Sequence, residues 1–203
     1  MFPSPIEKLI RIFSRFPTVG PRTATRFALY CLDAKKESVD ELVDALKELK
    51  KSVTSCSICF RSILTEEKLC SVCRDSKRNH HTICVVEKET DLLSIENTNE
   101  YDGIYFILGG TVSPLKKENF KSIRIKELED RLKNHKKYNL PKPKEVIIAT
   151  NQNTEGEATA IYINRILKPF KIKSTRLGRG LSTGSELEYA DEETLSYALK
   201  GRK

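Results

Sequence analysis

The sequence has no tryptophan, a single methionine and no long hydrophobic segment. A helix that spans a bilayer needs about 20 consecutive apolar residues, and no run in this chain approaches that length. The chain also shows no secretory-type hydrophobic region, no internal repeat and no low-complexity tract. We therefore expect a soluble cytoplasmic protein that makes no membrane contact, with cores filled by aliphatic residues and phenylalanine.

The charge is predominantly positive and unevenly spread. The chain has 203 residues and a formal net charge of +8, with 32% charged residues. A basic balance suits a polyanion such as nucleic acid, although many basic proteins bind none. Residues 1–30 carry five basic side chains against one acid, and residues 116–144 carry eleven against four. The second run has a helical pattern, which predicts a solvated helix face.

Two C-x-x-C pairs, separated by ten residues, are formed by Cys56, Cys59, Cys70 and Cys73. Two such pairs can close a tetrahedral shell of four sulfurs around zinc, and a closed shell is structural because it leaves no position for water. Disulfides and a redox C-x-x-C are the alternatives, which a reducing cytosol disfavours. Cys31 and Cys84 have the surroundings of ordinary small apolar residues.

The first 53 residues are predicted to form a small helical unit. An apolar stripe over residues 6–13 is followed by the break Phe16–Pro21 and by a second helix. The second helix is expected to bury Ala24, Phe27, Ala28 and Cys31. A third helix is expected to begin at Ser38, with Glu41 completing a capping box. It should carry the following side chains inward: Val39, Leu42, Val43, Leu46 and Leu49.

Strands and helices alternate after the cysteines. Strands are predicted at residues 83–86, 104–108, 146–149 and 171–177, and helices at 91–96, 126–137 and 156–167. Strands that are apolar throughout and alternate with helices indicate a parallel sheet covered on both faces. The fold class is therefore α/β.

The turn between the first two helices resembles a helix-hairpin-helix, a motif that binds the DNA backbone without reading sequence. Gly20 precedes a helix N-terminus that presents backbone N–H groups to a phosphate. Arg22 and Arg26 share one face of that helix and could straddle successive phosphates. A plain helical hairpin with solvated arginines is the alternative. The motif usually has glycine where this chain has Thr18.

Acidic residues follow two of the predicted strands, where a parallel sheet binds ligands. Glu87 ends the first strand, and Glu155 and Glu157 follow the third. This resembles the Toprim fold, whose acids support phosphoryl transfer through magnesium. The alternative is that the acids order loops or contact a partner protein. Tyr189 and Tyr197 have no adjacent base that would activate them as nucleophiles.

A helix-hairpin-helix, a four-cysteine module and a Toprim domain, in this order, resemble the RecR family of bacterial recombination mediators. The resemblance covers essentially the whole chain, and a glutamate pair is typical of the family. In that family the tail is a Walker-B-like segment that swaps between subunits. The segments that carry the resemblance are Phe16–Arg26, the four cysteines, Ile83–Glu87, Asp91-Leu92, Ser113-Pro114-Leu115, Ala149–Asn151, Glu155–Ala160, Gly184–Asp191 and Leu199–Arg202.

The resemblance implies a non-enzymatic DNA-binding mediator of recombination and repair. Family members form rings, commonly homotetramers, that encircle DNA, and with RecO and RecF they help to load RecA on gapped DNA. It implies that Arg22 and Arg26 face the DNA and that Glu155 and Glu157 contact RecO. The expected domains are residues 1–53, the zinc module 54–78, the Toprim domain 79–177 and the tail 178–203. A magnesium-dependent nuclease or topoisomerase-like enzyme, and an adaptor without DNA affinity, are the rival functions.

Overall fold

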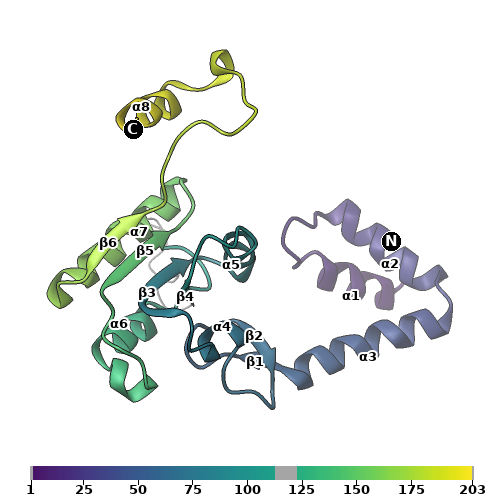
Figure 1. Cartoon of the computed structure of the whole chain (residues 1–203). Coiled ribbons are helices and arrows are strands. Elements are labelled where there is room, and N and C mark those ends of the chain that lie inside the picture. The colour runs from purple at the N-terminus through teal and green to yellow at the C-terminus, as the bar shows by residue number, and fades with distance from the viewer. Residues whose placement is uncertain (1, 113–122, 203) are drawn as a thin grey trace. The chain divides into compact units, whose positions relative to one another are not determined.

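The chain forms two compact units, residues 1–53 and 54–203 (Figure 1). The computed structural model describes residues 2–112 and 123–202, so the predicted family segment Ser113-Pro114-Leu115 lies outside the described residues. None of the helices within these ranges is both long enough and apolar enough to cross a membrane.

The first unit contains α1 (Ser4–Phe13), α2 (Pro21–Asp33) and α3 (Lys36–Ser52). The second contains β1 (Val53–Ser55, beginning at the boundary), β2 (Ser62–Leu64), α4 (Ser71–Arg74), β3 (Asn79–Val86), α5 (Glu89–Glu96), β4 (Gly103–Ile107), α6 (Ile125–Lys133), η2 (His135–Tyr138), β5 (Glu145–Ala149), α7 (Thr154–Leu167), η3 (Lys168–Phe170), β6 (Lys173–Arg176), η4 (Leu187–Tyr189) and α8 (Glu192–Lys200).

Helices α1 and α2 form a hairpin held by small and aromatic residues. Ala24 and Ala28 of α2 are fully buried, and their short side chains let α1 approach closely. Phe13 of α1 meets the ring of Phe27 edge to face, with centroids 5.7 Å apart. Phe27 is nevertheless 43% exposed and Cys31 is only half-buried, so the expected burial of this face holds for the two alanines alone.

Helix α3 differs from the expectation at its start and on its apolar face. It begins at Lys36 with Lys35 as N-cap and no side-chain cap, so the predicted capping box at Ser38 is wrong. Leu42, Leu46 and Leu49, predicted to point inward, are 46–55% exposed, and Val43 is also exposed, whereas Val39 is half-buried. The apolar spacing identifies the face of a helix that avoids water, but not the surface that covers it.

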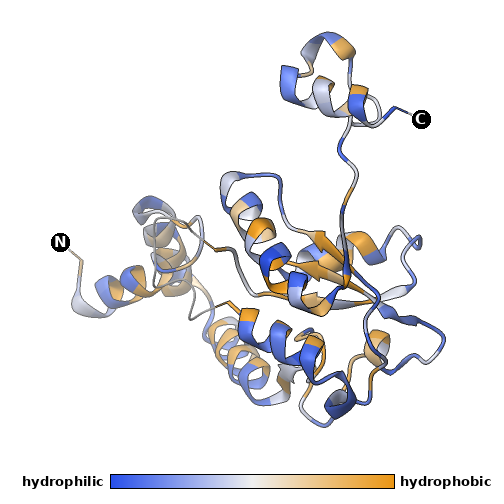
Figure 2. Ribbon diagram, turned by 90° about the vertical axis from the view of Figure 1, so that its left-hand side faces the viewer, coloured by the Kyte–Doolittle hydropathy of each residue, from blue (hydrophilic) through white to orange (hydrophobic). Residues whose placement is uncertain are grey.

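The second unit is built on a parallel sheet with the strand order β4-β3-β5-β6. Each neighbouring pair is parallel, and Val86 at the end of β3 lies opposite Ala149 at the end of β5. Every residue of β4 and the last four of β3 are buried. Figure 2 shows the strands of this sheet mainly in the hydrophobic colour. The continuous burial of β4 and of the end of β3 confirms the prediction of a covered sheet for these strands, whereas β5 has two half-buried residues and β6 has two exposed and two half-buried ones.

The cysteine module packs against β4, which is an edge strand. The backbone N–H of Ile107 donates to the carbonyl of Cys59 at 2.9 Å. The ring of Phe60 meets that of Phe106 edge to face, with centroids 5.3 Å apart. Edge strands carry unpaired backbone groups that otherwise attract other strands. The module therefore covers part of the exposed edge of the sheet.

The basic run that was expected to be a solvated helix face is divided in the structure. Helix α6 ends at Lys133, and the separate turn η2 follows instead of one helix to residue 137. Within α6, Arg131 is only 2% exposed. One basic side chain of this run is therefore a core residue, contrary to the expectation.

Candidate functional site

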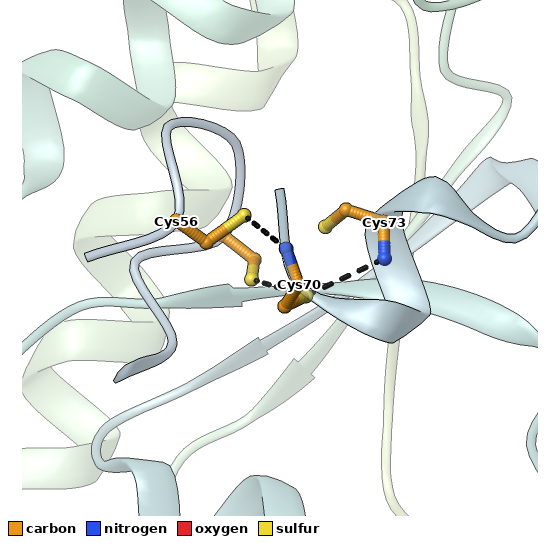
Figure 3. A group of neighbouring side chains, drawn as sticks. Cys56, Cys70 and Cys73 are labelled. Carbon is orange, nitrogen blue, oxygen red and sulfur yellow. Dashed lines mark hydrogen bonds between the residues drawn. The ribbon is translucent and has the colours of Figure 1, made fainter. Parts of the chain in front are cut away.

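The four cysteines converge in the structure from two turns of the chain. Their Sγ atoms all lie within 4.8 Å of one another, and all four side chains are buried. Figure 3 shows Cys56, Cys70 and Cys73 of this cluster. Cys56 and Cys59 flank a tight turn, while Cys70 is the N-cap of α4 and Cys73 lies within that helix. Backbone N–H groups of Cys70 and Cys73 point at the Sγ atoms of Cys56 and Cys70, each at 3.4 Å.

The cluster has the chemistry of a closed tetrahedral metal site. Sulfur atoms bound to one zinc ion at about 2.3 Å would lie about 3.8 Å apart, which matches this cluster. The Sγ atoms of Cys59 and Cys70 are 3.5 Å apart, far beyond the length of a disulfide bond, and all four thiols are free. Hydrogen bonding from Cys59 lowers the pKa of Cys56, and the same contact raises the pKa of Cys59. The donor set therefore fits zinc, with no position left for a reacting water.

Cys84 stands apart from this cluster. It lies in the middle of β3 and is 1% exposed. Burial raises the pKa of its thiol to about 12, so the thiol stays protonated at neutral pH. Cys84 is a packing residue, in agreement with its apolar sequence context.

The helical hairpin presents an open, positively charged helix start. Gly20 is the N-cap of α2, and no acidic residue lies in the first turn. A β-carbon placed on Gly20 would meet no atom within 4 Å, so the space in front of this backbone is open. Arg22 and Arg26 are exposed, and neither has an ion-pair partner in the part of the chain that the structure describes. The positive end of the helix and two unpaired guanidinium groups favour an anion.

Thr18 occupies the turn of this hairpin in a left-handed conformation, with a φ of 63°. Its hydroxyl group donates to the carbonyl of Pro17 at 2.6 Å. A β-branched residue is strained at this φ, which explains why glycine is usual at this position of the motif. The strain lies two residues before Gly20.

Glu87 lies where the sequence predicts it, at the carboxyl end of β3, but it faces the loop after β5. Its carboxylate accepts the backbone N–H of Asn151 at 2.7 Å and the side-chain amide of Asn151 at 2.6 Å. The side chain is 3% exposed. Gly156 makes this arrangement possible, because a β-carbon there would lie 2.0 Å from the carbonyl oxygen of Asn151. Glu87 therefore orders the loop at the edge of the sheet.

The other two acids lie in the first turn of α7 and have separate partners. Glu155 is exposed and accepts the hydroxyl group of Thr111 at 3.1 Å. Glu157 pairs with Arg176, at 2.6 Å, and with Arg179. The hydrogen bond from Arg176 is the main cause that lowers the pKa of Glu157. Two cations thus neutralise the charge that a magnesium ion would require.

The structure does not gather the three acids into one ligand set. Over residues 2–112 and 123–202, the cysteine cluster is the one group of potential metal ligands that converges. Tyr197 lies under the guanidinium group of Arg179, 4.5 Å from the ring centroid, and Tyr189 is 79% exposed. Neither tyrosine has a carboxylate or imidazole hydrogen-bond partner within those residues.

Sequence reasoning did not identify Asn151, Arg176 and Arg179 as partners of the acids. Asn151 could have been found, because it follows a strand that was predicted to lie beside the strand of Glu87. The two arginines lie in and after β6, whose position as the neighbour of β5 no local sequence signal reveals.

Family models match three consecutive parts of the chain. They are the RecR helix-hairpin-helix over residues 6–50, the Toprim domain over 81–178 and the RecR C-terminal region over 180–203. Recombination protein RecR of Staphylococcus haemolyticus (strain JCSC1435) is 45% identical over 201 residues, covering 99% of this chain and 98% of the relative. The chain belongs to the RecR family. Recombination protein RecR of Staphylococcus aureus (strain MRSA252) is 44% identical over the same proportions of both chains.

The RecR match fits the geometry described above. The basic hairpin lies in the region of the RecR helix-hairpin-helix, and the parallel sheet with Glu87, Glu155 and Glu157 lies in the Toprim region. The four-cysteine cluster lies between the two matched regions. The predicted family and the predicted α/β fold with these parts are both confirmed. Membership of the RecR family places the chain among recombination proteins.

Proposed function

We propose that this RecR-family chain is a non-enzymatic mediator of DNA recombination and repair. In this proposal it binds DNA without reading sequence, assembles as a tetrameric ring in the cytoplasm and helps, with RecO and RecF, to load RecA on gapped DNA. The observation that carries the proposal is the open, acid-free helix start at Gly20 with Arg22 and Arg26 beside it. It offers backbone N–H groups and positive charges to the phosphate backbone, which positions a protein on DNA without reading its sequence.

A ring is supported by apolar side chains that the single chain leaves in water. In the first unit they include the leucines of α3 and Leu32 of α2, and in the tail Leu187 and Leu199 are 63% and 64% exposed. Exposed apolar faces of this kind are typical of surfaces that another subunit covers. A ring would also multiply a few weak phosphate contacts from each hairpin, which raises avidity without sequence readout.

For the cysteine cluster we propose one structural zinc ion per chain. Cys56, Cys59, Cys70 and Cys73 would hold it and, as a closed shell, would stabilise the fold rather than activate water. The ion would fix the two turns against the edge of the sheet, where Ile107 meets Cys59.

For the acids of the sheet we propose a role in loop order and partner contact instead of magnesium chemistry. Glu87 is engaged by Asn151, and Glu157 by two arginines. Glu155 is exposed and accessible to a partner such as RecO. The rival function, a magnesium-dependent nuclease or topoisomerase-like enzyme, requires these acids to be available to the metal.

A gel assay with zinc-loaded protein tests the proposal. Labelled single-stranded, duplex and gapped DNA, and supercoiled plasmid, are incubated with the protein and magnesium, and light scattering gives the number of subunits. We expect the DNA to be shifted in a salt-dependent manner and to remain intact and supercoiled. Cleavage or relaxation that Glu155→Ala abolishes would establish the enzyme instead. No shift at low salt would favour the adaptor without DNA affinity.

A further inference from the structure

Arg131 links the cysteine module to the sheet from inside the protein. It projects from α6, and its Nη1 donates to the carbonyl of Tyr105 in β4 at 2.8 Å. The same nitrogen donates to the carbonyl of Ile58 at 3.0 Å. Ile58 lies between Cys56 and Cys59, so this bond reaches the backbone of the first cysteine turn. The guanidinium group also lies over the ring of Phe106, 5.6 Å from the centroid.

The positive charge of Arg131 has no carboxylate partner among the described residues. Its Nε and Nη2 atoms are buried without a hydrogen-bond partner there. A buried cation is costly unless an opposite charge compensates it, and an arginine cannot lose its proton at physiological pH to avoid this cost. Some other negative charge must therefore lie nearby for this residue to be tolerated in the core.

The cysteine cluster can supply that negative charge. The guanidinium group of Arg131 donates to the carbonyl of Ile58, so its buried positive charge lies beside the turn that carries Cys56 and Cys59. Four thiolates around one divalent ion leave a centre with two net negative charges. Such a centre is itself buried here, so it needs a neighbouring cation as much as Arg131 needs an anion.

We propose that Arg131 is the outer-shell positioning residue of the zinc centre: its buried charge balances the tetrathiolate, and its hydrogen bonds fix the first cysteine turn to β4. This inference rests on the zinc ion proposed above. It makes α6, a helix from the sheet domain, part of the metal site. Metal binding and the packing of the sheet are then energetically coupled through one side chain.

The test measures zinc release from full-length, zinc-loaded protein to a chromophoric chelator. Arg131→Gln keeps a hydrogen-bond donor but removes the charge, whereas Arg131→Lys keeps the charge. Arg124→Gln is the matched control. Like Arg131, Arg124 donates to a carbonyl of β4, here that of Ile107, and lies over a phenylalanine ring, here that of Phe60. Unlike Arg131, it is only half-buried. Loss of an outer-shell partner commonly weakens metal binding about 10- to 100-fold. We expect Arg131→Gln to release zinc about 10- to 100-fold faster and the other two variants to stay near the wild-type rate.

The absorption of the cobalt-substituted protein provides a second measurement, because its sulfur-to-metal bands report the four-sulfur shell directly. We expect Arg131→Lys to keep these bands. Release from Arg131→Gln at the wild-type rate, or equally fast release from both Arg131 variants, would overturn the charge-balancing role. If Arg131→Gln does not fold, release from Arg131→Lys decides alone, and a rate about tenfold above that of Arg124→Gln overturns the proposal. Wild-type protein that contains no zinc by elemental analysis would instead overturn the zinc centre itself.

Discussion

Asn151 donates two hydrogen bonds to the carboxylate of Glu87, one from its backbone and one from its side chain. We expect Glu87→Gln to lower the free energy of unfolding by about 1–3 kcal/mol, because an amide N–H then faces a donor inside the protein. Urea unfolding measures this loss. In a double-mutant cycle with Asn151→Ala, the combined loss should be smaller than the sum of the two single losses. Additive losses would show that the pair is not coupled.

The proposed DNA binding by the hairpin predicts that phosphate contacts set the salt dependence of binding. Each contact contributes about 0.9 to the slope of log K against log salt, so Arg22→Ala with Arg26→Ala should weaken binding and reduce the slope by about 2 for each engaged hairpin. The control is a double variant of α3, Lys36→Ala with Lys50→Ala, which also removes two positive charges. Both lysines are exposed. If the two double variants behave alike, net charge rather than the hairpin governs binding.

Removal of one cysteine of the proposed zinc site should unfold the second unit. We expect Cys56→Ser to abolish zinc binding and to give misfolded protein, because a structural metal contributes directly to folding. Elemental analysis and circular dichroism measure the two effects. Cys31→Ser, which removes a half-buried cysteine outside the cluster, should keep both zinc and fold. Zinc-free wild-type protein that is fully folded would contradict this prediction.

The ion pairs of Glu157 predict a pH dependence of stability. Hydrogen bonding from Arg176 lowers the pKa of Glu157 in the folded state below its unfolded value. The stabilisation is therefore present above the unfolded pKa, near 4.5, and is lost as the pH falls through the lower folded pKa. Between pH 7 and pH 3, we expect Glu157→Gln to lose less stability than the wild type in urea unfolding.

Glu155→Gln serves as the matched control for this effect. Glu155 lies in the same turn of α7, but among the described residues its carboxylate accepts only the hydroxyl group of Thr111 and pairs with no cation. This variant should follow the wild-type pH dependence. An identical pH dependence in all three proteins would mean that the arginine pairs contribute no measurable stability.

The left-handed conformation of Thr18 predicts a stabilising substitution. A non-glycine residue at this φ costs about 1–2 kcal/mol, and glycine recovers this at a smaller cost in unfolded-state entropy. We expect Thr18→Gly to slow hydrogen exchange of the α1 and α2 amides by an amount equivalent to about 0.5–1 kcal/mol. Thr18→Ala keeps the β-carbon and should give no such protection. Equal protection in both variants would assign the effect to loss of the hydroxyl group.

The elements that the sequence predicts correctly depend on patterns within one segment. The runs of β-branched residues in β3 and β5 favour strands, and two C-x-x-C pairs at this spacing are typical of a metal site. The position of Glu87 also follows from its strand, since the carboxyl ends of parallel strands share one edge.

The features that the sequence did not reveal depend on contacts between distant segments. Arg131 lies on the apolar face of α6 with Ile125, Leu128 and Leu132, but its charge predicts exposure, and only the approach of β4 and the cysteine turn gives it buried hydrogen-bond partners. Likewise, the pairing of Glu157 with Arg176 and Arg179 depends on β6 lying beside β5. The leucines of α3 are a third example. Their periodicity identifies the apolar face of the helix, but it does not identify the surface that covers this face.

The contact between Cys59 and Ile107 also has a consequence for synthesis on the ribosome. The cysteine turns precede β4 in the sequence and therefore leave the ribosome first. The module that covers the edge of β4 is thus synthesised before β4 itself. A nascent chain that binds zinc promptly has this cover ready when the sheet forms. In a cell short of zinc, we expect newly made chains to expose the β4 edge to one another and to aggregate through it, before any mature protein loses its metal.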